Sequence, residues 1–271
     1  MDLIPKRKTW LALWPVIFYL ATSGCKPFKN NLFPEPTFKE NDGDGPTVAI
    51  LSFQDLNPKD FKSLPDKGIR EIHLQGSTFN MTDLVTWKGL PRVEELYLSG
   101  TILNDADLAK LPDMTDLRKL DLSHTKVTGL SLGQLGQFRN LSELGLAFTD
   151  LSNMPNSELG NLKGVKALDL EATGITDSHL EYLPDLPKLE WLWVSGNRIS
   201  DDGLDNYISK MPKLKGLYIS GTQISDKGLP YLKRLKNLET LWIINRKFAN
   251  VPKEIFVHYV PHGCNVTYKR R

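Results

Sequence analysis

A repeat of aliphatic residues constrains this chain more than any other feature of its sequence. The period is 24 residues, with one step of 25, and the first, fourth and sixth positions of each unit are aliphatic. The units open at Ile69, Val93, Leu117, Leu141, Val165, Leu189, Leu214 and Leu238. Because successive side chains of a strand point to opposite sides, aliphatics at the fourth and sixth positions predict a short strand with one buried face. The fixed period predicts stacked copies of one small structural unit.

Two further signals follow the strand in each unit. The ninth position carries a hydroxyl or amide side chain that can satisfy backbone groups as the chain leaves the strand. These residues are Ser77, Thr101, Thr125, Thr149, Thr173, Asn197 and Thr222. Helix-capping pairs such as Ser200-Asp201 and Ser225-Asp226 then precede a stretch in which apolar residues recur every three positions, as at Leu180, Leu183 and Leu186. This stretch predicts a short helix with one buried face.

The pattern L-x-x-L-x-L-x-x-T/N-x-I resembles that of leucine-rich repeats from Ile69 to about Phe248. The subtype T-x-I-[ST]-D-x-G-L, present at 197–204 and 222–229, looks like repeats found in many exported bacterial proteins. The resemblance implies an α/β leucine-rich-repeat solenoid. Such a solenoid is a curved horseshoe with a parallel β-sheet on its concave face and short helices or 3-10 turns on its convex face. The unit from Leu141 is the least regular, since Pro155 and Asn156 predict an extended or 3-10 convex segment.

The chain therefore divides into five predicted segments. They are a signal peptide (1–24), a flexible tether (25–46), an N-terminal capping strand and helix (47–68), about eight leucine-rich repeats (69–248) and a C-terminal cap (249–271). Stacked repeats need covers at both open edges. Val48 and Ile50 alternate as a capping strand would, and at the other end Val251, Ile255, Phe256 and Val257 are expected to cover the last repeat.

The first 24 residues have the three-part composition of a secretory signal. A basic segment at 1–8 precedes an apolar run at 10–21, and the small residues Thr22, Ser23 and Gly24 follow. The apolar run is shorter than the roughly 20 residues that a membrane-spanning helix needs, and Pro15 interrupts it. We therefore expect export of the protein.

The segment Thr22-Ser23-Gly24-Cys25 resembles a bacterial lipobox, whose cysteine is acylated and becomes the first residue of the mature protein. The resemblance implies a lipoprotein anchored to the membrane by acyl chains, such as palmitate, on Cys25. It departs from the pattern at Thr22, where an aliphatic residue is usual. Cleavage after Ser23 or Gly24 and an uncleaved anchor are the alternatives. Lys26 after the cysteine implies the outer rather than the inner membrane, with a secreted or periplasmic protein as the alternative.

Charge and cysteine content exclude several classes of function. The formal charge is +2, and residues 1–24 account for it, so the rest of the chain is near neutral. A neutral body argues against a phosphate-binding surface, and we expect no nucleic-acid partner. Cys25 and Cys264 are too few for a disulfide framework and lack the spacing of a zinc site; a single bridge between them is disfavoured if Cys25 is acylated. We expect no cofactor, because no phosphate-binding loop or cofactor motif is present.

The predicted sheet allows its exposed surface to be read from the sequence. Neighbouring strands lie about 4.8 Å apart, so the third, fifth and seventh positions of successive units form a grid on the concave face. The C-terminal third of this grid is aromatic and holds Trp191, Trp193, Tyr218 and Trp242, which we expect side by side at exposed positions. Large aromatic side chains are typical binding anchors, so these residues predict a partner site. The alternative is that they cover the sheet backbone or pack beneath the cap.

The same grid carries an acidic strip next to the aromatic residues. We assign Asp121, Asp169 and Glu171 to the partner-binding surface, with Tyr97 as a further aromatic contact. Glu95 and Glu143 belong to the same strip. Carboxylates in this arrangement favour a basic group on the partner.

An enzyme would have to use Asp121, Ser123 and His124, and their spacing does not support one. Ser123 lacks the G-x-S-x-G elbow, and a strand places Asp121 and Ser123 on one face while His124 points elsewhere. His258 and His262 are spaced for a metal on a helix, but Pro261 disfavours helix there. We therefore predict no catalytic residue and no metal site, with a hydrolase as the remote alternative.

The sequence as a whole favours a non-catalytic, membrane-tethered leucine-rich-repeat module. Its concave face would mediate interaction with a protein, peptide or glycan. The alternative is a structural protein of the cell envelope, in which the solenoid is a spacer without a specific ligand.

Overall fold

The structure is a computed structural model, and it describes residues 37–39, 47–64, 68–245, 248 and 252–268. The chain divides into the units Met1–Glu35 and Pro36–Arg271. The predicted signal peptide and Cys25 lie outside the described residues, and so does most of the predicted tether. In the described residues, no helix has the length and apolar character needed to cross a membrane.

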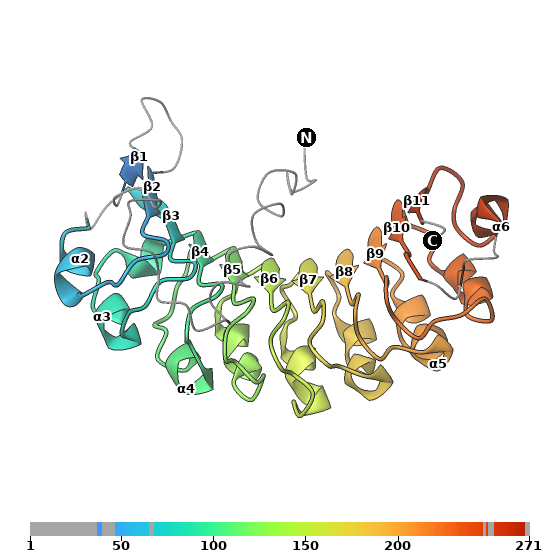
Figure 1. The fold of residues 1–271 in the computed structure, drawn as a ribbon, viewed down its shortest axis with the longest axis horizontal. Helices are drawn as coiled ribbons and strands as arrows, with labels where there is room; N and C mark the ends of the chain where they lie inside the picture. Colours follow the sequence, from blue (N-terminus) through green and yellow to red (C-terminus); the bar gives the residue numbers. More distant parts are fainter. Residues whose placement is uncertain (1–36, 40–46, 65–67, 246–247, 249–251, 269–271) are drawn as a thin grey trace, which may run out of the picture. The chain divides into compact units, whose positions relative to one another are not determined.

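A single sheet of 11 strands organises the unit Pro36–Arg271, and the strands follow one another in sequence order. Figure 1 shows the strands along one side of the repeats and the short helices along the other. β1 is antiparallel to β2, and every later neighbour is parallel. The strands are β1 (Thr37–Lys39), β2 (Thr47–Ile50), β3 (Ile69–His73), β4 (Glu95–Tyr97), β5 (Lys119–Asp121), β6 (Glu143–Gly145), β7 (Ala167–Asp169), β8 (Trp191–Trp193), β9 (Gly216–Tyr218), β10 (Thr240–Trp242) and β11 (Asn265–Thr267). The predicted parallel solenoid is confirmed.

Short helices connect the strands, and most of them are 3-10 helices. Apolar residues spaced by three, such as Leu180, Leu183 and Leu186, suit the three residues per turn of a 3-10 helix, and all three are buried. The irregular unit from Leu141 has a 3-10 helix after Pro155, as predicted. The helices are α2 (Pro58–Lys62), α3 (Met81–Val85), η1 (Leu90–Arg92), α4 (Asp105–Leu108), η2 (Leu132–Gln137), η3 (Asn156–Asn161), η4 (Asp177–Leu180), η5 (Leu183–Asp185), α5 (Asp201–Asn206), η6 (Ile208–Lys210), η7 (Leu229–Arg234) and α6 (Lys253–Val257).

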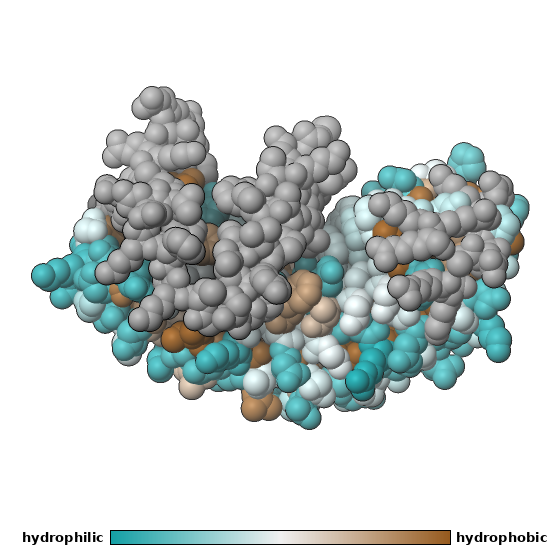
Figure 2. All heavy atoms as spheres, viewed as in Figure 1, coloured by the Kyte–Doolittle hydropathy of each residue, from teal (hydrophilic) through white to brown (hydrophobic). Residues whose placement is uncertain are grey.

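The core lies between the sheet and the helices and is continuous from repeat to repeat. The first, fourth and sixth residues of the units are buried, as Leu117, Leu120 and Leu122 illustrate. The ninth residue is also buried and bonds to the backbone as predicted, since the Thr101 hydroxyl donates to the Leu98 carbonyl at 2.7 Å. In Figure 2 the helical side carries mainly hydrophilic side chains. Burial of one aliphatic side chain contributes about 1.5–3 kcal/mol, so the repeated pattern supplies most of the stability.

Neighbouring repeats are also joined by a carboxylate that explains the [ST]-D-x-G-L motif. Asp177 accepts hydrogen bonds from the Ser200 backbone N–H at 2.8 Å and from its hydroxyl at 2.5 Å. A Cβ atom at Gly203 would lie 2.1 Å from Asp177 Oδ1, so only glycine leaves room for this carboxylate. Asp201 bonds to Ser225 in the same way in the next repeat. The aspartate of one repeat and the serine and glycine of the following repeat therefore form one contact.

The two ends of the array differ in how well the sequence predicts them. Residues 47–68, predicted as an N-terminal cap, contain β2 and α2, and the domain boundaries themselves stay predictions. At the other end, β11 extends the sheet beyond β10, which the sequence analysis did not predict. Phe256 is buried against the rings of Phe248 and Tyr268.

The prediction that Ile255 and Val257 cover the last repeat is wrong, because both side chains are exposed. Ile255, Phe256 and Val257 are consecutive residues of α6, and consecutive side chains of a helix point in different directions. Phe256 therefore points into the core, while Ile255 and Val257 point outward. Val251, which was expected to share this role, lies outside the described residues.

Candidate interaction surface

The third, fifth and seventh residues of the repeats form a surface that we call the strand face. β4, β5, β6 and β7 each consist of the third, fourth and fifth residues of a repeat. In each strand the first and last residues are half-buried and the middle residue is buried. The registers place equivalent positions of neighbouring strands directly beside each other, for example Asp169 beside Trp193 and Trp193 beside Tyr218. Side chains on this face therefore form rows that run across the sheet.

Four aromatic side chains lie together at the C-terminal end of the strand face, and we call them the aromatic row. Three of them end neighbouring strands at the fifth position of their repeats: Trp193 in β8, Tyr218 in β9 and Trp242 in β10. Their ring centroids are 5.0 Å and 6.2 Å apart, with interplanar angles of 20° and 22°. Trp191, the first residue of β8 and the third of its repeat, has its ring centroid 6.2 Å from that of Trp193. The structure thus brings together the four aromatic residues that the sequence singled out.

The exposure of the aromatic row differs from the prediction in one residue. Trp242 is 39% exposed, and Trp191 and Tyr218 are half-buried, but Trp193 is only 7% exposed. The prediction that all four are exposed is therefore wrong for Trp193. The reason is that the Trp193 ring is stacked between two other aromatic rings. Trp242 keeps its exposure at the end of the row, where the neighbouring residue on β11 is the smaller Thr267.

A glycine on the neighbouring strand makes room for Trp191, and the sequence analysis assigned it no role. Gly216 pairs with Trp191 in the sheet, and a Cβ atom at Gly216 would lie 2.0 Å from Trp191 Cε3. The indole ring therefore lies over the backbone of β9. Glycine is unfavourable inside a strand and often marks a close approach of another group. Its presence at a strand position was the signal that could have identified this contact.

The acidic strip lies next to the aromatic row. Asp121 Oδ1 accepts a hydrogen bond from the Ser123 backbone N–H at 3.0 Å, and Asp169 Oδ1 accepts one from Glu171 at 3.1 Å. Asp169 pairs with Trp193 in the sheet, so carboxylates and indoles adjoin at β7 and β8. A partner that binds the row therefore meets negative charge at one end of it.

Tyr97 is not part of the aromatic row, because it lies on β4, at the other end of the strand face. Its ring is stacked on His73 at 4.5 Å, and its hydroxyl donates to Glu95 at 2.5 Å. Burial and this hydrogen bond raise the pKa of Tyr97 above its ordinary range. The His73 ring bonds to Glu71 at 2.6 Å, and this bond lowers the pKa of Glu71. Tyr97 thus belongs to a second, polar cluster, which the sequence analysis did not identify.

Asp121, Ser123 and His124 are the residues of the hydrolase hypothesis. The contacts of their side chains do not support a catalytic relay. The Asp121 carboxylate accepts from the Ser123 backbone, and the His124 ring is stacked on the Phe148 ring at 4.5 Å. Burial lowers the pKa of His124, so its ring is neutral at pH 7. Among the described residues, no group of three or more His, Cys, Asp or Glu side chains is placed to hold a metal ion.

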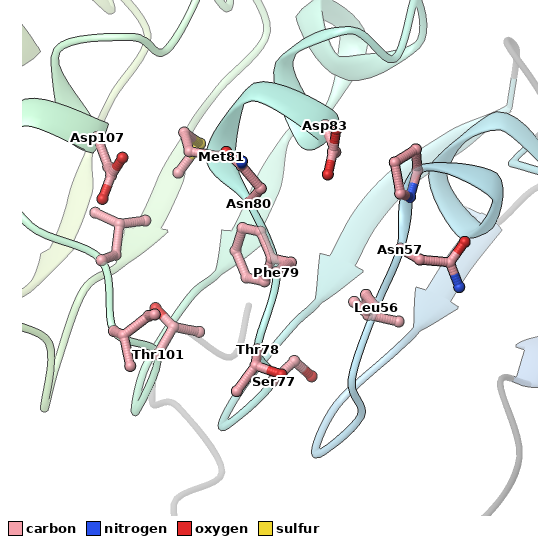
Figure 3. Close-up of a pocket in the computed structure, with 13 residues that line it drawn as sticks. Leu56, Asn57, Ser77, Thr78, Phe79, Asn80, Met81, Asp83, Thr101 and Asp107 are labelled. Atoms are coloured by element: carbon pink, nitrogen blue, oxygen red, sulfur yellow. The ribbon is translucent and has the colours of Figure 1, made fainter.

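An open groove of about 560 Å³ lies at the other end of the array, between the turns that follow β2, β3 and β4 (Figure 3). Its apolar part includes Leu56, Phe79 and Ile102. The polar side chains of Asn57 and Asn80 cap α2 and α3 by accepting backbone hydrogen bonds. The groove is therefore built largely from residues that begin the helices, and it is separate from the aromatic row.

Comparisons with known proteins agree on the fold. No protein-family model matches the sequence, and no curated protein does so either. Among solved structures, internalin C2 of Listeria monocytogenes is 22% identical with a TM-score of 0.49, covering 70% of this chain and 84% of that one. A leucine-rich-repeat protein of Leptospira interrogans is 19% identical with a TM-score of 0.52, and the match covers 80% of this chain and 58% of that one.

A third match is the complex of TLR13 with ssRNA13. TLR13 is 17% identical with a TM-score of 0.55, and the match covers 73% of this chain but only 36% of TLR13. The chain thus spans little more than half the length of the Leptospira protein and about a third of TLR13. At these identities the matches show the fold alone, and the chain is a leucine-rich-repeat solenoid.

Proposed function

We propose that this solenoid is a non-catalytic interaction module that binds a protein or peptide partner on its strand face, at the aromatic row. The observation that carries the proposal is the row itself: four large aromatic side chains stack across β8, β9 and β10, and their outermost member, Trp242, is exposed. Rigid aromatic side chains provide large contact areas at low entropic cost and dominate the binding energy of many interfaces. A solvated sheet face without a partner does not need them.

The geometry of the row favours a protein or peptide over a glycan. Sugars bind by stacking on the flat face of an aromatic ring, whereas the faces of Trp193 and Tyr218 are covered by their neighbours in the row. What the row offers to a partner is mainly ring edges, together with the exposed Trp242. Ring edges carry partial positive charge and suit carbonyl oxygens and apolar side chains.

The competing function is that of a structural spacer, in which the aromatic residues only cover the sheet. The burial of Trp193 and the close fit of Trp191 over Gly216 favour this alternative. Substitution of the exposed end of the row distinguishes the two, because Trp242→Ala leaves the buried Trp193 in place. We expect this variant to lose partners that the wild-type protein recovers from an envelope extract.

A matched control for this experiment is Tyr207→Ala. Tyr207 is a half-buried aromatic residue on the helical side, at the end of α5. The Tyr207→Ala variant should recover the same partners as the wild type. Circular dichroism should confirm that both variants are folded. If Trp242→Ala also recovers every partner, the solenoid does not bind through the aromatic row.

The proposed module is tethered to the membrane through Cys25. Support comes from the sequence alone, in the basic, apolar and small residues that precede this cysteine. Labelled palmitate should enter the wild-type protein and be absent from Cys25→Ser. Fractionation should then recover the label with the outer rather than the inner membrane. Absence of label from both proteins would favour a secreted or periplasmic protein.

The proposed partner is not a nucleic acid. The comparisons do not support this exclusion, since one fold neighbour is in complex with an RNA. Its basis is the near-neutral charge of the chain beyond residue 24 and the carboxylates beside the aromatic row, which repel phosphate. Fluorescence anisotropy with a labelled single-stranded RNA at low salt tests it, and saturable binding would reverse the exclusion.

A further inference from the structure

The eighth residue has a left-handed backbone in seven of the repeats, and in three of these it is not glycine. Glycine occupies the position at Gly76, Gly100, Gly196 and Gly221, with φ between 64° and 71°. His124, Phe148 and Ala172 occupy it in the three central repeats, with φ of 56°, 58° and 52°. Phe53, with φ of 60°, is the equivalent residue after β2.

These residues are structurally equivalent, so the difference between them lies in the side chain. The backbone N–H of Phe148 donates to Glu171 on the next repeat at 2.8 Å, and that of Gly196 donates to Ser220 at 2.8 Å. A Cβ atom makes this conformation unfavourable, while glycine adopts it freely. The turn is therefore formed most easily by glycine, and the aromatic side chains of His124 and Phe148 are not required for it. Strained residues of this kind concentrate at binding and catalytic sites.

The two rings form a stacked pair at the edge of the strand face, and Phe148 is its exposed member while His124 is half-buried. They are stacked with centroids 4.5 Å apart and an interplanar angle of 8°, and Phe148 is 50% exposed. On the next repeat the equivalent residue is Ala172, whose methyl group is too small to cover a phenyl ring. Figure 2 shows hydrophobic atoms at the surface where β6 and β7 lie in the same view. The pair thus leaves apolar surface in solvent.

Negative charge surrounds this apolar surface. The chain around the ends of β5, β6 and β7 contributes the fifth, seventh, eighth and tenth residues of three repeats to this surface. They are residues 121, 123, 124 and 126, residues 145, 147, 148 and 150, and residues 169, 171, 172 and 174. Among these twelve described residues the carboxylates are Asp121, Asp150, Asp169 and Glu171, and the one lysine is Lys126, so the formal charge is −3. The His124 ring adds no positive charge at pH 7 because burial lowers its pKa. Gly145 pairs with Asp121 and Asp169 in the sheet, and a Cβ atom there would lie 2.8 Å from Asp121 Oδ1, so the Asp121 carboxylate lies over this glycine.

We propose that the stacked pair of His124 and Phe148, with the carboxylates of Asp121, Asp169 and Glu171, is a second binding site. It takes a protein segment that presents an arginine or lysine next to an apolar side chain. The apolar side chain covers the exposed Phe148 ring, and the cation meets the carboxylates. Arginine fits best, because a guanidinium stacks on an aromatic ring and bonds to a carboxylate at the same time. The site adjoins the aromatic row and shares the acidic strip beside it, so it extends the proposed function to a second set of aromatic side chains, and charge complementarity defines its ligand.

Selection from a random peptide library displayed on phage, with the purified protein as bait, tests the proposal. We expect enriched peptides to contain arginine or lysine adjacent to an apolar residue. Phe148→Gly should bind these peptides about tenfold to a hundredfold more weakly, the range for loss of an interface anchor. Because glycine prefers the left-handed turn, this variant should remain folded, with a thermal midpoint close to that of the wild type.

Phe53→Gly is the matched control, because it removes an aromatic ring from the same left-handed position at the far end of the array. It should bind the selected peptides as the wild type does. The double variant Asp169→Asn, Glu171→Gln should weaken binding and reduce its dependence on salt. Three results would each overturn the proposal: no enrichment of peptides, enrichment of peptides without basic residues, or binding of the selected peptides by Phe148→Gly as tight as by the wild type.

Discussion

Replacing Gly216 with alanine should displace the Trp191 ring without removing any aromatic side chain. The new Cβ atom would lie 2.0 Å from Trp191 Cε3 and 2.4 Å from Cζ3, far inside van der Waals contact. Overpacking of this kind costs about 1–3 kcal/mol when the neighbours cannot move. Trp191 is half-buried and can swing outward, so the cost falls towards the stacking energy that it loses against Trp193, about 0.5–1.5 kcal/mol.

Part of that loss is offset in the strand itself. Alanine is more favourable than glycine inside a strand by about 0.5–1 kcal/mol. The net effect should therefore lie between about 0.5 kcal/mol of stabilisation and about 1 kcal/mol of destabilisation, so the melting temperature should fall by no more than roughly 4 °C for a chain of this size. Near-ultraviolet circular dichroism should change more clearly than stability, because the Trp191 and Trp193 rings no longer stack.

A double-mutant cycle separates the clash from the intrinsic effect of alanine. In a Trp191→Ala background the ring is gone, so Gly216→Ala should become neutral or stabilising. The coupling free energy between the two substitutions, measured by urea unfolding, should be about 1 kcal/mol. A coupling near zero, with unchanged near-ultraviolet circular dichroism in Gly216→Ala, would refute the placement of Trp191 over Gly216.

Three further predictions concern the contact between repeats, the polar cluster around Tyr97 and the half-buried thiol of Cys264. Gly203→Ala should lower the free energy of unfolding by about 1–3 kcal/mol, because the new Cβ atom would displace the Asp177 carboxylate that accepts hydrogen bonds from Ser200. Urea unfolding measures the change, and an unchanged midpoint would contradict the prediction. The hydrogen bond from His73 holds the pKa of Glu71 below its ordinary value of 4.5. This carboxylate therefore stabilises the fold above pH 4.5, and the stabilisation is lost as the pH falls through the pKa of Glu71 in the folded protein. The free energy of unfolding of Glu71→Gln, measured between pH 3 and 6, should accordingly depend less on pH than that of the wild type. Burial raises the pKa of Cys264 to about 11, so alkylation by iodoacetamide at pH 7.5, followed by mass spectrometry, should be at least tenfold slower in the folded than in the unfolded protein.

The repeat made the fold predictable from the sequence, because the same residue types must be buried in every unit. Aliphatic residues at the first, fourth and sixth positions define the strand and the core, and the hydroxyl at the ninth position defines the turn. The ends were less predictable because the period stops there. β11 contains a single apolar residue, Val266, so its pattern does not indicate a strand, and its place in the sheet depends on pairing with β10.

The candidate site was predictable in its membership and not in its packing. The period alone placed Trp193, Tyr218 and Trp242 in one row, since register follows from the repeat. The burial of Trp193 depends on how neighbouring rings stack, which no single repeat encodes. The left-handed backbone at Phe148 was also hidden, because phenylalanine does not indicate that conformation as glycine does. Alignment with the glycines of the sister repeats was the signal that could have identified it.

Site-specific photocrosslinking tests most directly whether a partner binds at the aromatic row. A photoreactive phenylalanine analogue is placed at Thr240, which lies on the strand face two residues before Trp242, or at Lys210, which is exposed on the helical side. After irradiation in an envelope extract, we expect a crosslinked partner from position 240 and none from position 210. A partner crosslinked only from position 210, or from neither position, would contradict binding at the strand face.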